Sequence, residues 1–381
     1  MLRNEKYILV DNEDSLVKLL ADLDQYDVAA VDTERNSRHH YPVRLCLLQI
    51  AVGKHYYIVD SLCGLNFDAL FKTRAMQTLI LHAAENDLNF LWKTYGYLPK
   101  RIFDTMLAAK YIGEEKYGLA YLVEKYFGDK LKKENQKADW TIRPLSFEMC
   151  EYAIHDTLYL NELSAILTDK LNKLNRMSWF TEHCNILIEH AKIPPGDQWR
   201  IEGTYKYQPR ELNIFKHIWN WREKQAEELN RPTFKVMSQQ LMIAIVDALS
   251  PHFPNINASY LPKLPINFKG KRLQSFLNML RRAVSVPECD WPRRLPKASM
   301  PPKLPSDESI DKFKRWRNEK AEELQINEKA LIASNLQLNW LAAQGTIPMQ
   351  TRYKEAHLML WQQNMWNEIL QDKCNYNNMM E

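Results

Sequence analysis

Two acidic residues at the end of an apolar segment constrain this chain more than any other feature of its sequence. Residues 28–31 (VAAV) are typical of a buried strand, and Asp32 and Glu34 follow directly. A carboxylate in that position is costly unless a cation lies against it. Side chains two residues apart on a strand share one face of the sheet, so both carboxylates are expected to point the same way.

Two more acids lie in helical contexts downstream. Asp87 falls in the first turn of a predicted amphipathic helix, and Asp156 follows Tyr152 at a spacing of four, on one face of a second helix. That second helix is predicted to begin near Ser146, a favourable N-cap residue. Four carboxylates in one pocket would take up protons unless divalent cations neutralised them. Two hard cations about 3.5–4 Å apart, held by oxygens, are the apparatus of phosphodiester hydrolysis.

Each of these residues has a plainer interpretation when it is taken alone. Asp87 could stabilise the start of its helix, and Tyr152 could be a core aromatic. Asp156 could be a solvated acid on a helix surface. Their order and contexts together favour a shared site over coincidence.

Three other polar residues near these acids are predicted to be structural. Asp104 is expected to N-cap a helix that begins at Thr105. His82 and His155 flank the acids in sequence, but hard cations such as Mg²⁺ prefer oxygen ligands. Both histidines are therefore expected to serve the fold.

The first part of the chain, residues 1–195, alternates predicted strands and helices. Strands are predicted at 28–34, 44–51, 55–60 and 78–82, and helices over 14–24 and around 88–95, before Gly96. The second and third of these strands are joined by a short turn that contains Gly53, which is a hairpin signal. This order favours an α/β domain with a mixed sheet flanked by helices.

The rest of the chain shows no convincing strand pattern and is predicted to be helical. Residues 192–208 are typical of a linker, and a proline-rich joint at 287–305 divides the helical part in two. The sequence WREKQAEEL at 221–229 recurs as WRNEKAEEL at 316–324, with six of nine positions identical at an offset of 95. This match favours duplication. The predicted domains of the chain are 1–195, 208–290 and 306–381.

Composition limits the compartment and the partners of the protein. The chain of 381 residues carries a net charge of +4, which permits an acidic partner without requiring one. Its six cysteines show no CxxC spacing, which favours buried, reduced thiols in a reducing compartment. The N-terminus lacks the apolar core of a signal peptide, and no stretch approaches the roughly 18 apolar residues of a membrane span. A cytoplasmic protein without membrane association is expected.

The acids and their surroundings resemble the three motifs of the DEDDy 3′→5′ exonucleases, and most of all those of the ribonuclease D family. The matching motifs are Asp32-Thr33-Glu34, the helix with Asp87, and Tyr152-x-x-x-Asp156. Residues 43–50 (VRLCLLQI) and 139–145 (DWTIRPL) extend the likeness, which covers about 1–190. The repeated helical segments resemble HRDC domains, which bind nucleic acid. The resemblance implies a ribonuclease H-like α/β exonuclease domain followed by two all-α HRDC-like domains, the second of them divergent.

The same resemblance implies two-metal-ion hydrolysis. The four acids would hold two divalent cations, Mg²⁺ or Mn²⁺, and Asp32 is the candidate to bridge both. Tyr152 would orient the attacking water, because a tyrosine with an ordinary pKa of about 10 is a poor general base. The implied substrate is RNA with a free 3′ end, such as a tRNA precursor, trimmed to release nucleoside 5′-monophosphates. A nuclease with its own binding domains needs no partner chain, so a monomer is expected.

Basic residues occur where a polyanion would need them. The candidates for RNA contact are Arg35, Lys132, Lys133, Lys137, Lys271 and Arg272. The first follows the motif-one acids, the three lysines after it precede the third motif, and the last two lie in the first helical domain. One basic cluster alone is more typical of a solvated surface. The whole set beside a nuclease favours a channel that follows phosphates, with strong salt dependence.

Two other functions stay open on the sequence. A DNA exonuclease of the proofreading or repair type would use the same fold, and the 2′-hydroxyl contact that distinguishes RNA has no visible motif. The helical pair, with no helicase or polymerase in the chain, tilts the interpretation toward RNA. A non-catalytic RNA-binding protein on the nuclease fold would lack a motif acid, whereas all four acids and Tyr152 are present.

Overall fold

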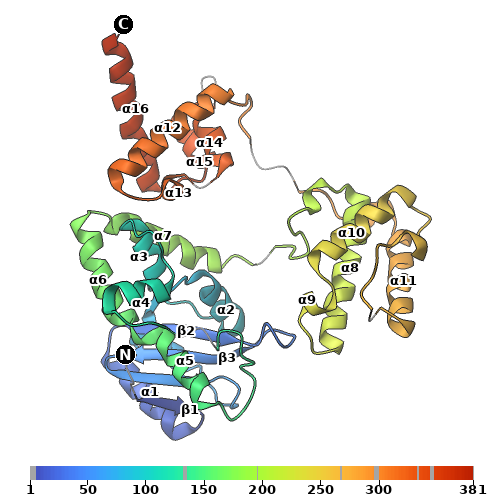
Figure 1. Ribbon diagram of the computed structural model, residues 1–381, viewed down its shortest axis with the longest axis horizontal. Helices are drawn as coiled ribbons and strands as arrows, with labels where there is room; N and C mark the ends of the chain where they lie inside the picture. Colours follow the sequence, from blue (N-terminus) through green and yellow to red (C-terminus); the bar gives the residue numbers. More distant parts are fainter. Residues whose placement is uncertain are drawn as a thin grey trace. The chain divides into compact units, whose positions relative to one another are not determined.

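The computed structural model of the chain describes residues 6–131, 135–194, 196–266, 268–295, 300–332, 334–343 and 347–380, with 373–380 described by their backbone only. These residues form two compact units (Figure 1). The first unit draws its described residues from Met1–Glu34, Leu45–Ile193 and Ala298–Glu381, and the second draws them from Arg35–Arg44 and Pro194–Lys297.

A six-stranded mixed sheet forms the centre of the first unit. Its strands, in the order in which they lie side by side, are β1 (Tyr7–Val10), β4 (His55–Asp60), β3 (Leu45–Val52), β2 (Ala29–Arg35), β5 (Thr78–Leu81) and β6 (Arg101–Asp104). β3 and β4 pair antiparallel through the predicted hairpin. β4 pairs in parallel with β1, and β5 pairs in parallel with both β2 and β6. The mixed sheet expected from the sequence is confirmed, and β1 and β6 are strands that the sequence interpretation missed.

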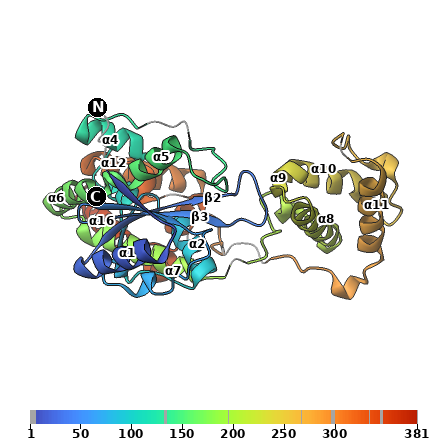
Figure 2. The same ribbon diagram turned by 90° about the horizontal axis from the view of Figure 1, so that it is seen from below.

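Helices cover both faces of this sheet, which Figure 2 shows nearly edge-on. One face packs against α1 (Glu13–Gln25) and α2 (Glu85–Tyr95), in a core that includes Leu48 of β3. The other face packs against α5 (Phe147–Leu158), in a core that includes Leu47 of β3. Every residue of β3 is buried, because neither of its faces meets solvent, and this explains its continuous apolar sequence.

Local signals in the sequence set the ends of several helices. Gly96 ends α2 in the left-handed conformation, with φ 62°. Ser146 N-caps α5 by accepting a hydrogen bond from the backbone N–H of Met149 (3.2 Å). Asp104 N-caps α3 (Thr105–Tyr111). These three predictions are confirmed. The other α-helices among the described residues of this part are α4 (Leu119–Phe127), α6 (Leu160–Lys173) and α7 (Met177–Ala191), and two short 3-10 helices span Leu70–Lys72 and Ala75–Gln77.

The second unit is helical and has its own core. Its α-helices are α8 (Pro209–Glu228), α9 (Thr233–Val236), α10 (Gln239–Leu249) and α11 (Gly270–Ser285). Phe215 and Phe276 are fully buried in this core. The segment Arg35–Arg44 belongs to the same unit, where the Tyr41 hydroxyl donates a hydrogen bond to Glu223 (2.8 Å).

The C-terminal helices repeat the local order of the second unit. They are α12 (Asp307–Leu324), α13 (Glu328–Leu331), α14 (Asn335–Leu341), α15 (Met349–Glu355) and α16 (Leu360–Met380). Asn230 after α8 and Gln325 after α12 both adopt the left-handed conformation, and the short helices α9 and α13 follow at the same offset. Ser238 and Ser334 then N-cap α10 and α14. This shared order supports the duplication predicted from the sequence.

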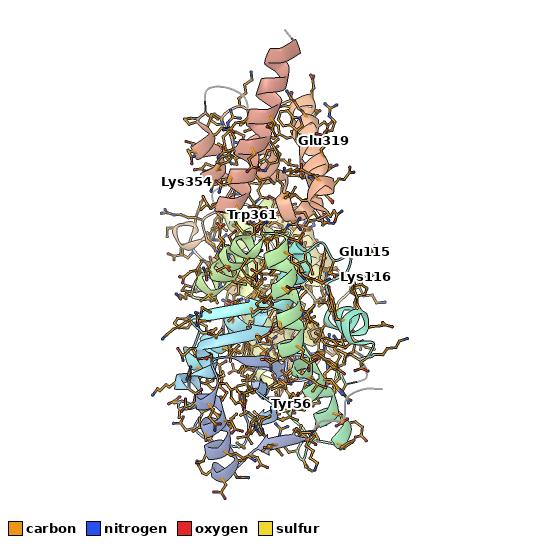
Figure 3. All side chains as sticks on the ribbon, turned by 90° about the vertical axis from the view of Figure 1, so that its left-hand side faces the viewer. Tyr56, Glu115, Lys116, Glu319, Lys354 and Trp361 are labelled. Carbon is orange, nitrogen blue, oxygen red and sulfur yellow. The ribbon has the colours of Figure 1, made fainter. Side chains whose placement is uncertain are left out.

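The C-terminal helices pack against α7 and belong to the first unit. Trp361, which is labelled in Figure 3, lies near the start of α16. Its ring stacks on that of Trp179, with centroids 4.5 Å apart and 16° between the planes. Glu182 accepts hydrogen bonds from the backbone N–H groups of Leu360 (2.6 Å) and Trp361 (3.2 Å), which satisfies the start of α16. These helices share the core of the first unit, and the separate domain at 306–381 stays a prediction.

The sequence led to expectations about the cysteines and about membrane-spanning helices, and the structure describes both features. Cys46, Cys150 and Cys184 are buried thiols, as expected, whereas Cys289 is exposed. The five described cysteines are all free. Within the described part of the chain, no helix combines the length and the apolar character that a bilayer crossing requires.

Candidate active site

The sheet and α5 bring three carboxylates together at one site. Asp32 and Glu34 lie on β2, and Asp156 lies on α5. Each offers a carboxylate oxygen, and these oxygens lie within 4.8 Å of one another. On β2, Ala30 and Val31 pack into different cores, on opposite faces of the sheet. The two-residue period of the strand therefore directs Asp32 and Glu34 to the same face as Ala30.

The fourth predicted acid, Asp87, lies in the first turn of α2, and its side chain is buried. Its carboxylate accepts a hydrogen bond from the hydroxyl of Thr33 on β2. Thr33 stands between Asp32 and Glu34 in sequence, so one strand carries two of the acids and holds a third. Asp87 itself lies outside the close group of three oxygens found among the described residues.

Asp104 fixes the start of α2, a role that sequence reasoning missed. Besides capping α3, its carboxylate accepts hydrogen bonds from the backbone of Ala83 (3.1 Å) and Ala84 (2.9 Å). Ala83 adopts the left-handed conformation, with φ 61°, which is unfavourable for an alanine and needs such support. The adjacent His82 is hydrogen-bonded through Nδ1 to the hydroxyl of Thr105 (2.9 Å). Side chains at the start of α3 therefore hold α2, and with it the fourth acid.

Burial and mutual repulsion change the ionisation of the acids. Burial, followed by the charges of Asp156 and Asp87, raises the pKa of Asp32 well above its usual range. Burial raises the pKa of Asp156 to about 7, although a hydrogen bond with Tyr152 opposes this shift. A site that holds on to protons in this way is one that cations would stabilise.

Tyr152 lies one helical turn before Asp156 on α5, and its hydroxyl is hydrogen-bonded to that carboxylate. Its ring packs against Trp140, with centroids 5.9 Å apart. Burial, followed by the charges of Asp156 and Glu34, raises the pKa of Tyr152. The phenol therefore stays protonated at neutral pH and can act as a hydrogen-bond donor.

The predicted RNA-contacting residues have different surroundings. Lys132 and Lys133 lie outside the described residues. Lys137 is exposed in the segment that precedes α5, and Arg35 ends β2. These placements leave their contact with RNA a prediction.

Lys271 and Arg272 are adjacent on α11 but differ in environment. Arg272 lies over the ring of Phe268 (4.6 Å) and donates a hydrogen bond to the carbonyl of Val236 (3.4 Å). Burial lowers the pKa of its guanidinium. Lys271 is exposed and lines a groove of about 670 Å³ between α8 and α11. Sequence reasoning missed the packing role of Arg272, and its contact with RNA stays a prediction.

The groove between α8 and α11 is lined mainly by cations and amides. The cations are Lys224, Lys271 and Arg282, the amides are Asn220, Gln225, Gln274 and Asn278, and Glu228 is the acid. Trp221 also lines the groove and donates a hydrogen bond from its indole N–H to the Ser275 hydroxyl (3.1 Å). Cations suit phosphate groups, and amides suit the edges of bases.

Comparison with known proteins shows which class of protein this fold and site belong to. The 3′-5′ exonuclease family matches residues 7–172, and the HRDC domain family matches residues 211–252. The first match contains the four acids and Tyr152. The chain therefore combines a 3′-5′ exonuclease domain with an HRDC domain.

Individual relatives show which exonucleases the chain resembles. A ribonuclease D of Nitrobacter hamburgensis is 30% identical over 307 residues, which are 77% of this chain and 77% of that protein. Ribonuclease D of Escherichia coli is 26% identical over 295 residues, 75% of this chain and 77% of that protein. The crystal structure of Escherichia coli RNase D matches the fold over 96% of this chain and 99% of its own, with a TM-score of 0.69 at 23% identity.

The chain belongs to the ribonuclease D family. Its substrate is accordingly a nucleic acid. Exonucleases of this family bind divalent metal, for which the group of Asp32, Glu34 and Asp156 is the candidate site here.

Proposed function

We propose that this protein is a metal-dependent 3′→5′ exoribonuclease that trims the 3′ ends of structured RNA, such as tRNA precursors. The observation that carries the proposal is the group of three carboxylates within 4.8 Å of one another, with Asp87 held against the same strand. Half-buried acids gathered in this way, with the buried Asp87 beside them, are unfavourable on their own, so a stabilising role in the fold does not account for them. The products would be nucleoside 5′-monophosphates.

The donor set fits hard divalent cations. All four acids offer carboxylate oxygens, which Mg²⁺ and Mn²⁺ prefer. We infer that Asp32, Glu34, Asp87 and Asp156 would hold two such ions. When bound, the ions supply activation of water and stabilisation of the negative charge that develops during phosphodiester cleavage.

The side chains around the acids would orient the reactants. The Tyr152 hydroxyl is protonated at neutral pH even with an ordinary pKa of about 10, and burial raises its pKa further. It would therefore direct the attacking water by a hydrogen bond and not by removing its proton. Glu34 would accept a hydrogen bond from the terminal 3′ hydroxyl, which would make a free 3′ end a requirement. The start of α2, held by Asp104, would keep the fourth acid in place.

RNA is favoured over DNA as the substrate. The Escherichia coli RNase D that shares the fold is described as an exoribonuclease involved in structured RNA processing. A DNA exonuclease of the repair type and a non-catalytic RNA-binding protein are the alternatives. The cationic groove between α8 and α11 would add affinity for the strand through Lys271 and its neighbours, with the salt dependence of phosphate contacts.

The domain division that goes with this function is an exonuclease domain at 1–195, an HRDC domain at 208–290 and a second, divergent HRDC-like domain at 306–381. The repeated order of α8–α10 and α12–α14 supports the relation between the last two. A nuclease with its own binding domains would act as a monomer in the cytoplasm.

The test uses 5′-labelled RNA and DNA strands, each with either a free 3′ hydroxyl or a blocked 3′ end, incubated with Mg²⁺, Mn²⁺ or EDTA. A metal-dependent ladder that shortens from the free 3′ end of RNA, and far less from DNA, is expected. Equal cutting of DNA would favour the repair enzyme. Binding without a ladder under any metal would favour the non-catalytic protein.

A further inference from the structure

The Tyr152 ring is held from one side by a tryptophan. Trp140 is only 1% exposed, and its ring lies 5.9 Å from that of Tyr152, with 38° between the planes. Its indole N–H has no hydrogen-bond partner in the described part of the chain. No polar contact orients the ring, so its position follows from packing and from the backbone that carries it.

That backbone is folded around an arginine. The Arg143 guanidinium donates hydrogen bonds to the carbonyls of Trp140 (2.8 Å) and Ile142 (2.8 Å). On the other flank of Trp140, the Asp139 carboxylate accepts hydrogen bonds from the backbone (3.1 Å) and the hydroxyl (2.6 Å) of Thr141. The segment that carries the indole is therefore fixed on both sides of it.

Arg143 is in turn anchored to the sheet. Two nitrogen–oxygen contacts of 2.5 and 2.6 Å join its guanidinium to Asp60, and a third hydrogen bond reaches the carbonyl of Cys46 (3.4 Å). Asp60 ends β4 and is 6% exposed, and Cys46 lies on β3. Desolvation makes a buried ion pair a weak source of stability, so a geometric role accounts better for its presence.

We propose that the ion pair between Arg143 and Asp60 positions Tyr152 for the hydrolysis proposed above, on which this inference rests. Trp140 transmits the position from the sheet to α5. The sheet carries two of the acids and, through Trp140, also positions Tyr152. The acids and the tyrosine are therefore both held in place by the same sheet. Arg143, Asp60 and Trp140 act through Tyr152 and are positioning residues.

A double-mutant cycle tests the coupling. We expect Asp60→Asn to lower kcat on a short single-stranded RNA by about 10- to 100-fold, because a small displacement of a positioned group has effects of this size. KM should change by less than about threefold. In a Tyr152→Phe background, where no hydroxyl is left to position, the same change should lower kcat by less than about threefold. An equal loss in both backgrounds would overturn the proposal.

The matched control is Glu114→Gln, another change of a buried carboxylate to an amide in the same unit. Glu114 pairs with Lys125 (2.5 Å) and also accepts a hydrogen bond from the Tyr126 hydroxyl, so its polar partners differ from those of Asp60 and Arg143. Its effect on kcat should be the same factor with and without the Tyr152 hydroxyl. Should Asp60→Asn fail to fold, Arg143→Lys keeps the positive charge, loses the forked contacts, and is expected to show the same dependence on Tyr152.

A second measurement needs no activity and no metal. In protein labelled with 3-fluorotyrosine and kept in EDTA, the Tyr152 ¹⁹F resonance is the one missing from Tyr152→Phe. We expect Asp60→Asn, Arg143→Lys and Trp140→Phe to shift it, and Glu114→Gln to leave it in place. An unmoved resonance in the first two variants would refute the positioning role. This result is independent of whether the nuclease assay succeeds.

Discussion

The carboxylate site and the α8–α11 groove are both polar, but they are built in opposite ways. At the site, each acid is buried or half-buried and is held by a neighbour, as Thr33 holds Asp87. In the groove, Lys271 and its fellow cations are long side chains on helix surfaces. Charges in a shielded place interact strongly and demand geometry, whereas exposed charges are screened and tolerate displacement. Hydrolysis at the site should therefore be lost when one carboxylate oxygen is replaced. The affinity of the groove for RNA should instead fall in proportion to the charge removed.

The largest expected effect comes from replacing one oxygen at the site. Asp32→Asn should lower hydrolysis by about 10³-fold or more, because metal-ion catalysis contributes several kcal/mol. Affinity for RNA in Ca²⁺ should change by less than about threefold, since the groove is untouched. Gel shifts and ladder assays measure the two quantities. The control is Asp169→Asn, an exposed acid of α6 that pairs with Lys173. Turnover close to that of the unmodified protein in Asp32→Asn would disprove the metal assignment.

A smaller loss of activity is expected when the Thr33 hydroxyl, which holds the fourth acid, is removed. Thr33→Val keeps the shape of the side chain and removes the hydrogen bond to Asp87, so it should weaken Mn²⁺ activation by about 10- to 100-fold. Titration of activity with Mn²⁺ measures this change. Thr33→Ser restores a hydroxyl and should recover most of the affinity. If Thr33→Val and Thr33→Ser behave alike, the hydrogen bond has no part in metal binding.

Removing cations from the groove should lower the affinity for RNA by a smaller factor, and it should change how that affinity depends on salt. Replacing Lys271 and Arg282 together by alanine should weaken binding of a long single strand by about 10-fold at moderate salt. The slope of log affinity against log salt should fall by about 1.4, which is 0.7 for each phosphate contact on a single strand. The kcat on a short oligomer should not change. Lys263→Ala, an exposed lysine outside the groove, is the control. A loss of kcat would mean that the groove serves the chemistry as well as the binding.

The smallest effect concerns the stability of the metal-free site. Because burial raises the pKa of Asp156 to about 7, the folded protein keeps a proton that the unfolded chain releases near pH 4. The stabilisation is complete below pH 4 and is lost as the pH rises through 7. In EDTA, the melting temperature should therefore fall by several degrees across this window, at about 2–4 °C per kcal/mol. Mg²⁺ or Mn²⁺ should restore most of it at pH 8. An unchanged melting temperature would mean that burial does not raise the pKa of Asp156 in the folded protein.

The sequence revealed those parts of the fold and site that depend on neighbouring residues. The hairpin of β3 and β4, the caps at Ser146 and Asp104, and the stop at Gly96 all follow from short patterns. The acids could be singled out because a carboxylate at the end of a buried strand has no ordinary role. β1 and β6 were missed because four residues are too short to show a period.

Contacts between distant residues left no trace in the sequence. The hydrogen bonds from Ala83 and Ala84 to Asp104, and those from Arg143 to Asp60, join residues about 20 and 83 positions apart. A charged residue on an amphipathic helix gives no sign of whether it faces solvent or packs on a ring. The sequence therefore groups Arg272 with the exposed cations, whereas its guanidinium lies over Phe268.

The packing of Trp361 on Trp179 has a consequence for the order of synthesis. The sheet and α1–α7 are translated before most of the second unit, and the helices that cover α7 are translated after it. At about 5–20 residues per second, the surface around Trp179 waits on the order of ten to forty seconds for its cover. The unit that holds the acids is therefore completed only after the second unit has been translated. A nascent chain would therefore reach its full stability only after both of its helical regions have been translated.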